Sequence, residues 1–246
     1  MGVLHETLIN VRLMHTCSVL LRRNLKTVKG KSHSSQLWLE RQMRDPYVEL
    51  AKQENYRCRS AFKLLEVNEK FRIFTPGQVV VDCGAAPGSW TQVAVKLTNA
   101  DGKDPDVPIG SVIAIDKLPM HPIEGARILG GCDFMAKESQ DKLHAVLGDK
   151  PVNLVLSDMA PNATGVKELD HDGITSLAYA ALKFALEMSH PDATFLVKLW
   201  DGGQSQQLEN DISRFYNNIR VIRPMATRSE SSEKFILARG FKGLKT

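Results

Sequence analysis

The chain has 246 residues, enough for one or two domains, and its 43% hydrophobic and 24% charged residues are typical of a globular protein. No apolar run is long enough to cross a membrane. The four cysteines are unevenly spaced and form no C-x-x-C pair, which argues against a disulfide framework and against a zinc site. The sequence therefore predicts neither a membrane span nor a bound metal.

The first 36 residues differ in composition from the rest of the chain. They contain six lysines or arginines and a single acid, Glu6, with aliphatic residues scattered between them. A basic, acid-poor and potentially amphipathic leader is typical of a mitochondrial transit segment. A basic arm that binds RNA is the alternative. We predict a transit segment over residues 1–36, a single domain over residues 37–246, and a location in the mitochondrial matrix.

The net charge of +4 is unevenly distributed. Without the leader the rest of the chain is close to neutral, and its positive charge is concentrated over residues 37–75 and 219–246, with an acidic middle. Any contact with nucleic acid should therefore use a patch built from these two ends. The candidate arginines are Arg57, Arg59, Arg220, Arg223 and Arg228.

Residues 79–90, VVVDCGAAPGSW, predict a buried strand that leads directly into a glycine-rich turn and a helix. Three consecutive valines suit a central parallel strand covered on both faces, and Asp82 ends that apolar run. Gly84 and Gly88 would let the backbone approach a ligand closely, and Pro87 suits a first helical position. A small polar ligand at the end of the strand is the functional interpretation, and a tight turn without a ligand is the alternative.

Strand and helix patterns alternate through the rest of the chain. Further strands are predicted over residues 111–116, 126–131, 152–158, 193–199, 219–223 and 234–239. Helices are predicted over residues 57–71, 90–97, 139–147, 173–188 and 205–216. This order predicts an α/β fold with a doubly wound, Rossmann-like sheet of about seven strands, mostly parallel. The last two strands are close in sequence and should form an antiparallel pair at one edge.

Four charged residues lie where folding alone does not require a charge. Lys198 interrupts a strand of the buried type, and Asp158 closes another. Lys63 lies in the apolar stretch of a helix, and Glu233 precedes the final strand. Because an unpaired buried ammonium group is costly, a lysine in a central strand should be paired or functional. A structural network of ion pairs is the alternative to a reacting centre.

The turn and the four charged residues together resemble the FtsJ/RrmJ family of ribose 2′-O-methyltransferases, in particular its branch acting on mitochondrial large-subunit rRNA. The resemblance runs from about residue 37 to the C-terminus. The segments that carry it are RSAFKLLE (59–66), VVDCGAAPGSW (80–90), AIDKLPMHPIEGA (114–126), SDMAPNATG (157–165), FLVKLW (195–200) and SSEKF (231–235). Ser89 departs from the glycine of many relatives, and Thr227 departs from the usual serine.

The resemblance implies S-adenosylmethionine (SAM) as the methyl donor and assigns roles to particular residues. The reacting centre would be Lys63, Asp158, Lys198 and Glu233, which we call the tetrad. The residues that would line the SAM pocket are Gly84, Pro87, Gly88, Trp90, Asp116, Asp133 and Asp158. Asp116 would hold the ribose hydroxyls of SAM, and Asp133 its adenine amine. Carboxylates suit SAM because it carries a sulfonium and an ammonium group.

The same resemblance implies methylation of a uridine 2′-hydroxyl in mitochondrial large-subunit rRNA, by analogy in the A loop of the peptidyl-transferase centre. The partner would be that rRNA or the assembling large ribosomal subunit. Within the family the SDMAPN turn favours rRNA, although sister branches act on tRNA or mRNA caps with the same tetrad. A non-catalytic rRNA-binding assembly factor is a second alternative. A nicotinamide oxidoreductase is disfavoured because the third glycine of its fingerprint is missing.

The reaction itself requires that a ribose hydroxyl lose its proton. Lys198 could act as the general base if burial and the neighbouring Lys63 cation lower its pKa. Asp158 and Glu233 would raise the pKa of Lys198 and would fix its orientation. Positioning of the two reactants should supply much of the remaining rate enhancement.

Overall fold

The computed structural model describes residues 44–162, 164–202 and 204–244. The chain divides into two compact units, Met1–Glu54 and Asn55–Thr246. The described part of the first unit contains helix α3 (Pro46–Gln53), whose N-cap Asp45 accepts a hydrogen bond from the amide of Tyr47. The expected transit segment lies outside the described residues. The expectation of one domain over residues 37–246 stays a prediction.

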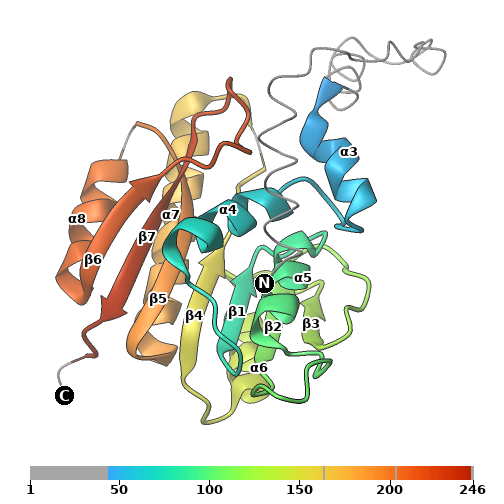
Figure 1. The fold of residues 1–246 in the computed structure, drawn as a ribbon. Helices are drawn as coiled ribbons and strands as arrows, with labels where there is room; N and C mark the ends of the chain where they lie inside the picture. The colour runs from blue at the N-terminus through green and yellow to red at the C-terminus, as the bar shows by residue number, and fades with distance from the viewer. Residues whose placement is uncertain (1–43, 163, 203, 245–246) are drawn as a thin grey trace. The chain divides into compact units, whose positions relative to one another are not determined.

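The second unit is built on a seven-stranded sheet (Figure 1) with the order β3-β2-β1-β4-β5-β7-β6. The strands are β1 (Val79–Cys83), β2 (Ser111–Asp116), β3 (Ala126–Gly130), β4 (Val152–Ser157), β5 (Ser189–Trp200), β6 (Tyr216–Ile222) and β7 (Glu233–Phe241). All neighbouring pairs are parallel except those of β7, which runs antiparallel to β5 and to β6. The α/β class and the mostly parallel sheet with an antiparallel pair at one edge are confirmed.

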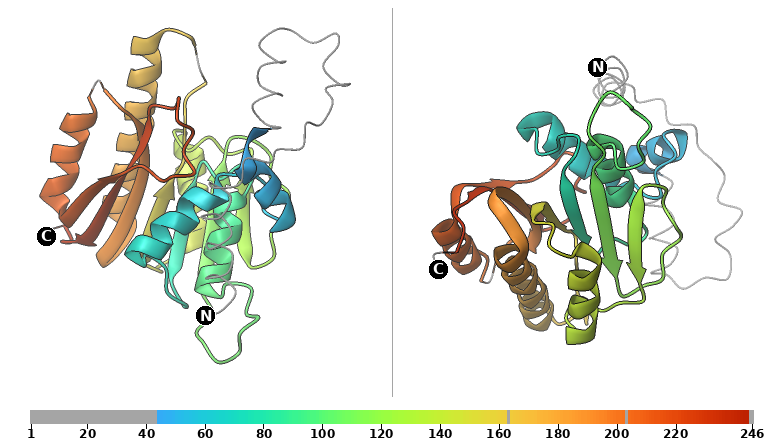
Figure 2. Two further views of the ribbon diagram at one scale, coloured as in Figure 1. Left: turned by 45° about the horizontal axis from the view of Figure 1, so that its top comes forward. Right: turned by 90° about the horizontal axis from the view of Figure 1, so that it is seen from below.

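Helices cover both faces of this sheet (Figures 1 and 2). One face packs against α4 (Ala61–Phe71) and α5 (Ser89–Thr98). The other packs against α6 (Lys137–Leu147), α7 (Lys167–Met188) and α8 (Ser205–Phe215). Val80 belongs to the first core and Val81 to the second, and both are fully buried, as expected for a central strand. In the described ranges, no helix has the length and apolar composition that a membrane crossing needs.

Several helices begin at positions that the sequence pattern did not predict, among them α4, which begins at Ala61 instead of residue 57. Helix α7 begins at Lys167, ahead of the expected residue 173, because its first turns are polar and show no apolar periodicity. The carboxylate of Asp170 fixes the preceding loop by accepting hydrogen bonds from the amides of Thr164 (2.7 Å) and Gly165 (3.2 Å). Helix α5 begins after a glycine N-cap, so the expectation that Pro87 occupies the first helical position is wrong.

The chain reverses its direction of winding at the centre of the sheet, where β1 pairs with β2 on one side and with β4 on the other. In doubly wound sheets, ligands bind beyond the carboxyl ends of the strands at this switch point. Gly84 directly follows β1, and Asp158 directly follows β4. The glycine-rich turn and one tetrad residue therefore meet where the fold favours a binding site.

Candidate active site

A hollow of about 460 Å³ lies beyond the carboxyl ends of β1, β2 and β4. We call it the switch-point hollow. Four residues of the expected SAM pocket line it: Gly84, Asp116, Asp133 and Asp158. Apolar side chains complete the wall, among them Ile115, Phe134 and Leu177. Three carboxylates on an otherwise partly apolar wall suit a ligand that has both a positive charge and an apolar ring.

Gly84 lets the loops after β1 and β4 come together. Its φ is +76°, and a Cβ placed on it would lie 2.6 Å from Cγ of Met159 and 2.8 Å from the backbone nitrogen of Met159. A side chain would therefore be strained in this conformation and would displace the turn that follows β4. The amides of Gly84 and Ala85 both donate to the carbonyl of Ile115, at 2.9 and 3.2 Å. The glycine thus places the loops of three strands around one hollow.

Asp116 organises the wall of the switch-point hollow with both of its carboxylate oxygens. Its Oδ2 accepts a hydrogen bond from the amide of Ala86 at 2.8 Å, and its Oδ1 accepts one from the amide of Leu118 at 2.7 Å. Asp133 similarly accepts from the amide of Met135 at 2.9 Å. Because each carboxylate oxygen has a further lone pair, both residues can still accept a hydrogen bond from a ligand.

Pro87, Gly88 and Trp90 are not among the residues that line this hollow. Trp90 is only 2% exposed, and its indole nitrogen donates to the carbonyl of Ser60 at 2.8 Å. Its ring packs against Phe235 with 5.6 Å between the ring centroids. The Trp90 side chain thus connects α5 to α4 and to the sheet. A direct contact of these three residues with SAM stays a prediction.

Arg57 holds two loops that border the hollow, a role with no signal in the sequence. Its guanidinium donates to the carbonyls of Pro87 (2.8 Å), His121 (2.9 Å) and Pro122 (2.8 Å). A Cβ on Gly88 would lie 2.8 Å from Nη1 of Arg57, so the glycine leaves room for this contact. We expected Arg57 to contact phosphates. In the structure its guanidinium donates hydrogen bonds to carbonyls of the two loops.

The tetrad forms two ion pairs. Nζ of Lys198 lies 2.9 Å from Oδ1 of Asp158 and also donates to the backbone carbonyl of Asp158 at 2.5 Å. Nζ of Lys63 lies 2.5 Å from Oε1 of Glu233. The Lys63 ammonium also lies over the ring of Phe235, 5.8 Å from its centroid. Lys198 and Glu233 are only 8% and 9% exposed, so both pairs are held in a largely water-free environment.

The strand register brings the two pairs together. Lys198 on β5 is the direct partner of Phe235 on β7, and Glu233 on β7 is the partner of Trp200. Because side chains alternate along a strand, Lys198, Phe235 and Glu233 project from the same face of the sheet, the one that α4 covers. Lys63 reaches Glu233 from α4, the helix that covers this face. Asp158 belongs both to this cluster and to the switch-point hollow.

Helix α4 is tied to the loop that precedes β7. The carboxylate of Glu66 accepts hydrogen bonds from the amides of Met225 (2.6 Å) and Ala226 (3.0 Å). Arg59 donates to the carbonyl of Ala226 at 2.5 Å. These contacts fix the helix that carries Lys63 against the segment that leads to Glu233. They therefore position one ion pair of the tetrad, although none of their side chains belongs to it.

Asp82, in β1, is a fully buried carboxyl group directly behind the site. Its Oδ2 accepts a hydrogen bond from the hydroxyl of Thr91 at 2.7 Å, whereas its Oδ1 has no hydrogen-bond partner among the described residues. Burial raises the pKa of Asp82 from 3.8 to about 7. The hydrogen bond from Thr91 acts against this shift, and the charges of Asp158 and Asp116 add to it. In the sequence, Asp82 marks the end of an apolar run just before the glycine-rich turn, and its raised pKa was not predicted.

The Asp82→Asn substitution should make the protein's stability less dependent on pH. Because the pKa of Asp82 is higher in the folded state, its contribution to stability is fully present below pH 3.8 and is lost as the pH rises to about 7. Between pH 6 and pH 8 the wild type should lose about 1 kcal/mol more stability than the variant. Urea unfolding of both proteins at the two pH values measures this. Identical pH dependence would show that Asp82 is ionised in the folded protein.

The model of a protein family described as FtsJ-like methyltransferase matches residues 56–241, a range that includes the whole sheet, the switch-point hollow and the tetrad. The chain belongs to the FtsJ-like methyltransferase family. The resemblance inferred from the motifs is thus confirmed.

Several relatives of this methyltransferase align over nearly its whole length. The Drosophila melanogaster protein "rRNA methyltransferase 2, mitochondrial" is 53% identical over 234 residues, which are 94% of each chain. The Cereibacter sphaeroides protein "Ribosomal RNA large subunit methyltransferase E" is 43% identical over 223 residues, 91% of each chain. A crystal structure described as a ribosomal RNA methyltransferase from Plasmodium falciparum matches with a TM-score of 0.67 and 26% identity, over 77% of this chain and 100% of that one.

Proposed function

We propose that this methyltransferase uses SAM to methylate the 2′-hydroxyl of a uridine in mitochondrial large-subunit rRNA, in the A loop of the peptidyl-transferase centre by analogy. It would act in the mitochondrial matrix, on the rRNA or on the assembling large subunit, and support assembly of that subunit. The observation that carries the proposal is that Asp158 both lines the switch-point hollow and pairs with Lys198. A bound cofactor and a reacting hydroxyl would therefore be neighbours. The names of the aligned relatives favour rRNA as the substrate.

The composition of the switch-point hollow supports SAM as the cofactor. Three carboxylates and one lysine, Lys117, line it, so acidic groups outnumber basic ones, which suits the positive charges of SAM. Asp116 would accept the ribose hydroxyls and Asp133 the adenine amine, with Phe134 among the apolar walls. Its volume of about 460 Å³ falls in the usual range for small-molecule sites. When bound, SAM supplies an activated methyl group.

The tetrad would prepare the ribose hydroxyl for the transfer. In its neutral form, the amine of Lys198 would accept the proton of the ribose hydroxyl as the hydroxyl oxygen takes up the methyl group. SAM would supply that methyl group and would keep the electron pair of the broken carbon–sulfur bond. Two contacts from Asp158 hold the amine in place and leave its remaining direction for the hydroxyl. The Lys63–Glu233 pair limits where the ribose can lie. The ribose product is uncharged, and Lys198 ends as an ammonium group.

A rescue experiment in cells that lack the protein tests this proposal. The full chain should restore one ribose methylation, mapped in organellar large-subunit rRNA, and the Lys198→Ala variant should not. A chain that lacks residues 1–36 should also fail, but should succeed when it is given an unrelated mitochondrial leader.

Each alternative predicts a different result. Rescue by the chain without residues 1–36 and without any leader would favour the basic RNA-binding arm. A missing methyl group on tRNA or on mRNA caps, with normal organellar rRNA, would contradict the proposed substrate. Recovery of subunit assembly by Lys198→Ala, without any methylation at the restored subunits, would separate an assembly role from the catalytic one.

A further inference from the structure

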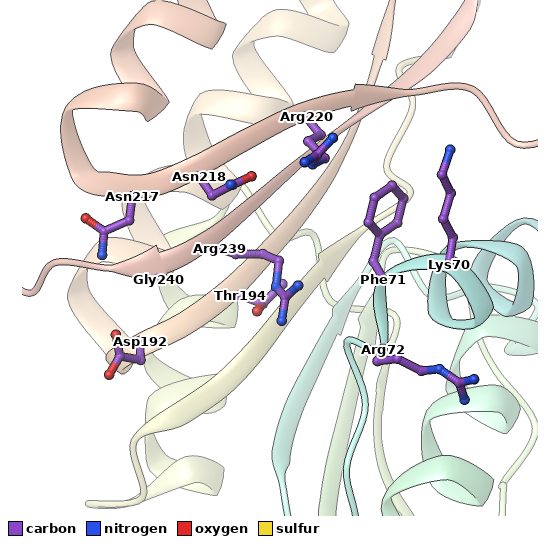
Figure 3. A pocket seen from close by; sticks show the side chains of 10 residues that line it. All are labelled: Lys70, Phe71, Arg72, Asp192, Thr194, Asn217, Asn218, Arg220, Arg239 and Gly240. Atoms are coloured by element: carbon purple, nitrogen blue, oxygen red, sulfur yellow. The ribbon is translucent and has the colours of Figure 1, made fainter.

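A second hollow, of about 670 Å³, lies on the α4 side of the sheet, where α4 ends (Figure 3). Lys70, Phe71 and Arg72 line it from the end of α4, and Arg220 and Arg239 project into the same region from β6 and β7. We call it the basic groove. It shares no residue with the switch-point hollow.

The four cationic side chains of the groove have no partner of their own. Within the described part of the chain, Lys70, Arg72, Arg220 and Arg239 form no side-chain hydrogen bond or ion pair, and Lys70 only lies over the ring of Phe71, 5.4 Å from its centroid. All four are exposed. One carboxylate, Asp192, also lines the groove. The groove therefore has a clear excess of positive charge.

Two other arginines, one near each end of the chain, donate hydrogen bonds within the protein. Arg57 donates to three loop carbonyls, as described above. Arg223 likewise donates to the carbonyls of Arg228 (3.2 Å), Ser229 (3.1 Å) and Ser231 (2.5 Å). These two arginines stabilise loops. Among the described residues, Lys70, Arg72, Arg220 and Arg239 have no such partners, which changes our expectation of where a polyanion binds.

The sheet places this groove in line with the tetrad. Arg239 is the register partner of Thr194 on β5, four residues before Lys198 on the same strand. At the usual rise per residue of a strand this is about 13 Å. Lys63 and Lys70 are seven residues apart on α4, or about 10 Å at the rise of a helix. Both routes place the groove a few nucleotides of RNA away from the reacting ribose.

We propose that the basic groove binds the phosphate backbone of the RNA substrate a few nucleotides from the methylated ribose. This inference rests on the proposed function. Like charges gathered in one groove repel one another, and an anion removes that repulsion. Contacts of lysine and arginine with phosphates supply a large share of the affinity of proteins for nucleic acids and make that affinity depend on salt. The groove would therefore set affinity and direction of the strand, while the tetrad acts on the hydroxyl.

The double variant Arg220→Gln, Arg239→Gln tests the groove. Binding to a transcript of the A loop with its flanking helices would be measured by fluorescence anisotropy at several salt concentrations. Loss of two phosphate contacts should lower the slope of log affinity against log salt by about 1.4 to 1.8. At 0.1 M salt the affinity should fall by about 25- to 60-fold. SAM affinity and thermal unfolding should match the wild type.

Lys142→Gln with Lys150→Gln is the matched control, because it removes two exposed cations on and just after α6, the helix on the opposite face of the sheet. This control should keep the wild-type slope. If the double groove variant folds poorly, each single variant should still lower the slope by about 0.7 to 0.9. A groove variant that has the wild-type slope and still binds and methylates the transcript would overturn the proposal that the groove binds phosphates. The proposed function would remain intact. A wild type that binds SAM but does not methylate the transcript would instead contradict the proposed function.

Discussion

Replacing Lys198 by alanine should lower the rate of methyl transfer by at least about 100-fold, the usual contribution of a general base. Lys198 pairs with Asp158 but does not line the switch-point hollow, so SAM affinity should stay within a few fold of the wild type. Single-turnover methylation of the A-loop transcript measures the first quantity, and calorimetry with SAM measures the second.

The Lys198→Arg variant separates catalysis from structure. An arginine keeps the positive charge and can still pair with Asp158, but its guanidinium does not lose its proton in proteins. It should therefore fold with nearly normal stability and yet be as inactive as the alanine variant. If Lys198→Arg transferred methyl groups at the normal rate, the lysine would be part of a structural ion-pair network only.

Replacing Asp116 by alanine should weaken SAM binding by about 1–3 kcal/mol, or roughly 5- to 150-fold. The variant would lose the carboxylate proposed to accept hydrogen bonds from SAM. It also leaves the amides of Ala86 and Leu118 without an acceptor, which should loosen the wall of the hollow. The rate of methyl transfer at saturating SAM should change much less than SAM affinity. Calorimetric titration with SAM gives the affinity.

Two further variants bracket this result. Asp116→Asn keeps one oxygen that can accept a hydrogen bond, so its affinity should fall between those of the wild type and the alanine variant. Asp141→Ala removes an exposed acid on α6 that does not line the hollow, and this variant should bind SAM normally. Wild-type affinity in Asp116→Ala would show that the cofactor is held elsewhere.

The sequence was most informative where a residue type was unusual for the element in which it was predicted to lie. Lys198 interrupts a buried strand, and the structure shows the cost offset by two contacts to Asp158. Gly84 was recognised as a position of close approach, but the close neighbour is the protein's own Met159. In both cases the residue type and its immediate neighbours in the sequence were sufficient to predict a special role without knowledge of distant contacts.

Other features depend on contacts that no local pattern records. Arg57 binds carbonyls far along the chain, and nothing around it distinguishes it from Arg220, which has no such partners in the described structure. The buried environment of Asp82 arises only when α5 and neighbouring strands enclose it. The start of α7 was missed because polar turns stabilised by Asp170 lack the periodicity that predicts a helix.

The position of β7 has a consequence for when the protein becomes active. This strand is the last one along the chain, yet it lies between β5 and β6, which are synthesised before it. A nascent chain that ends before Glu233 can already hold the residues of the switch-point hollow, but it lacks one member of the tetrad, and β5 and β6 lack their shared neighbour. If the tetrad carries out the proposed reaction, synthesis must pass Glu233 before chemistry can begin. The final strand therefore joins the sheet by pairing with two strands that are already synthesised.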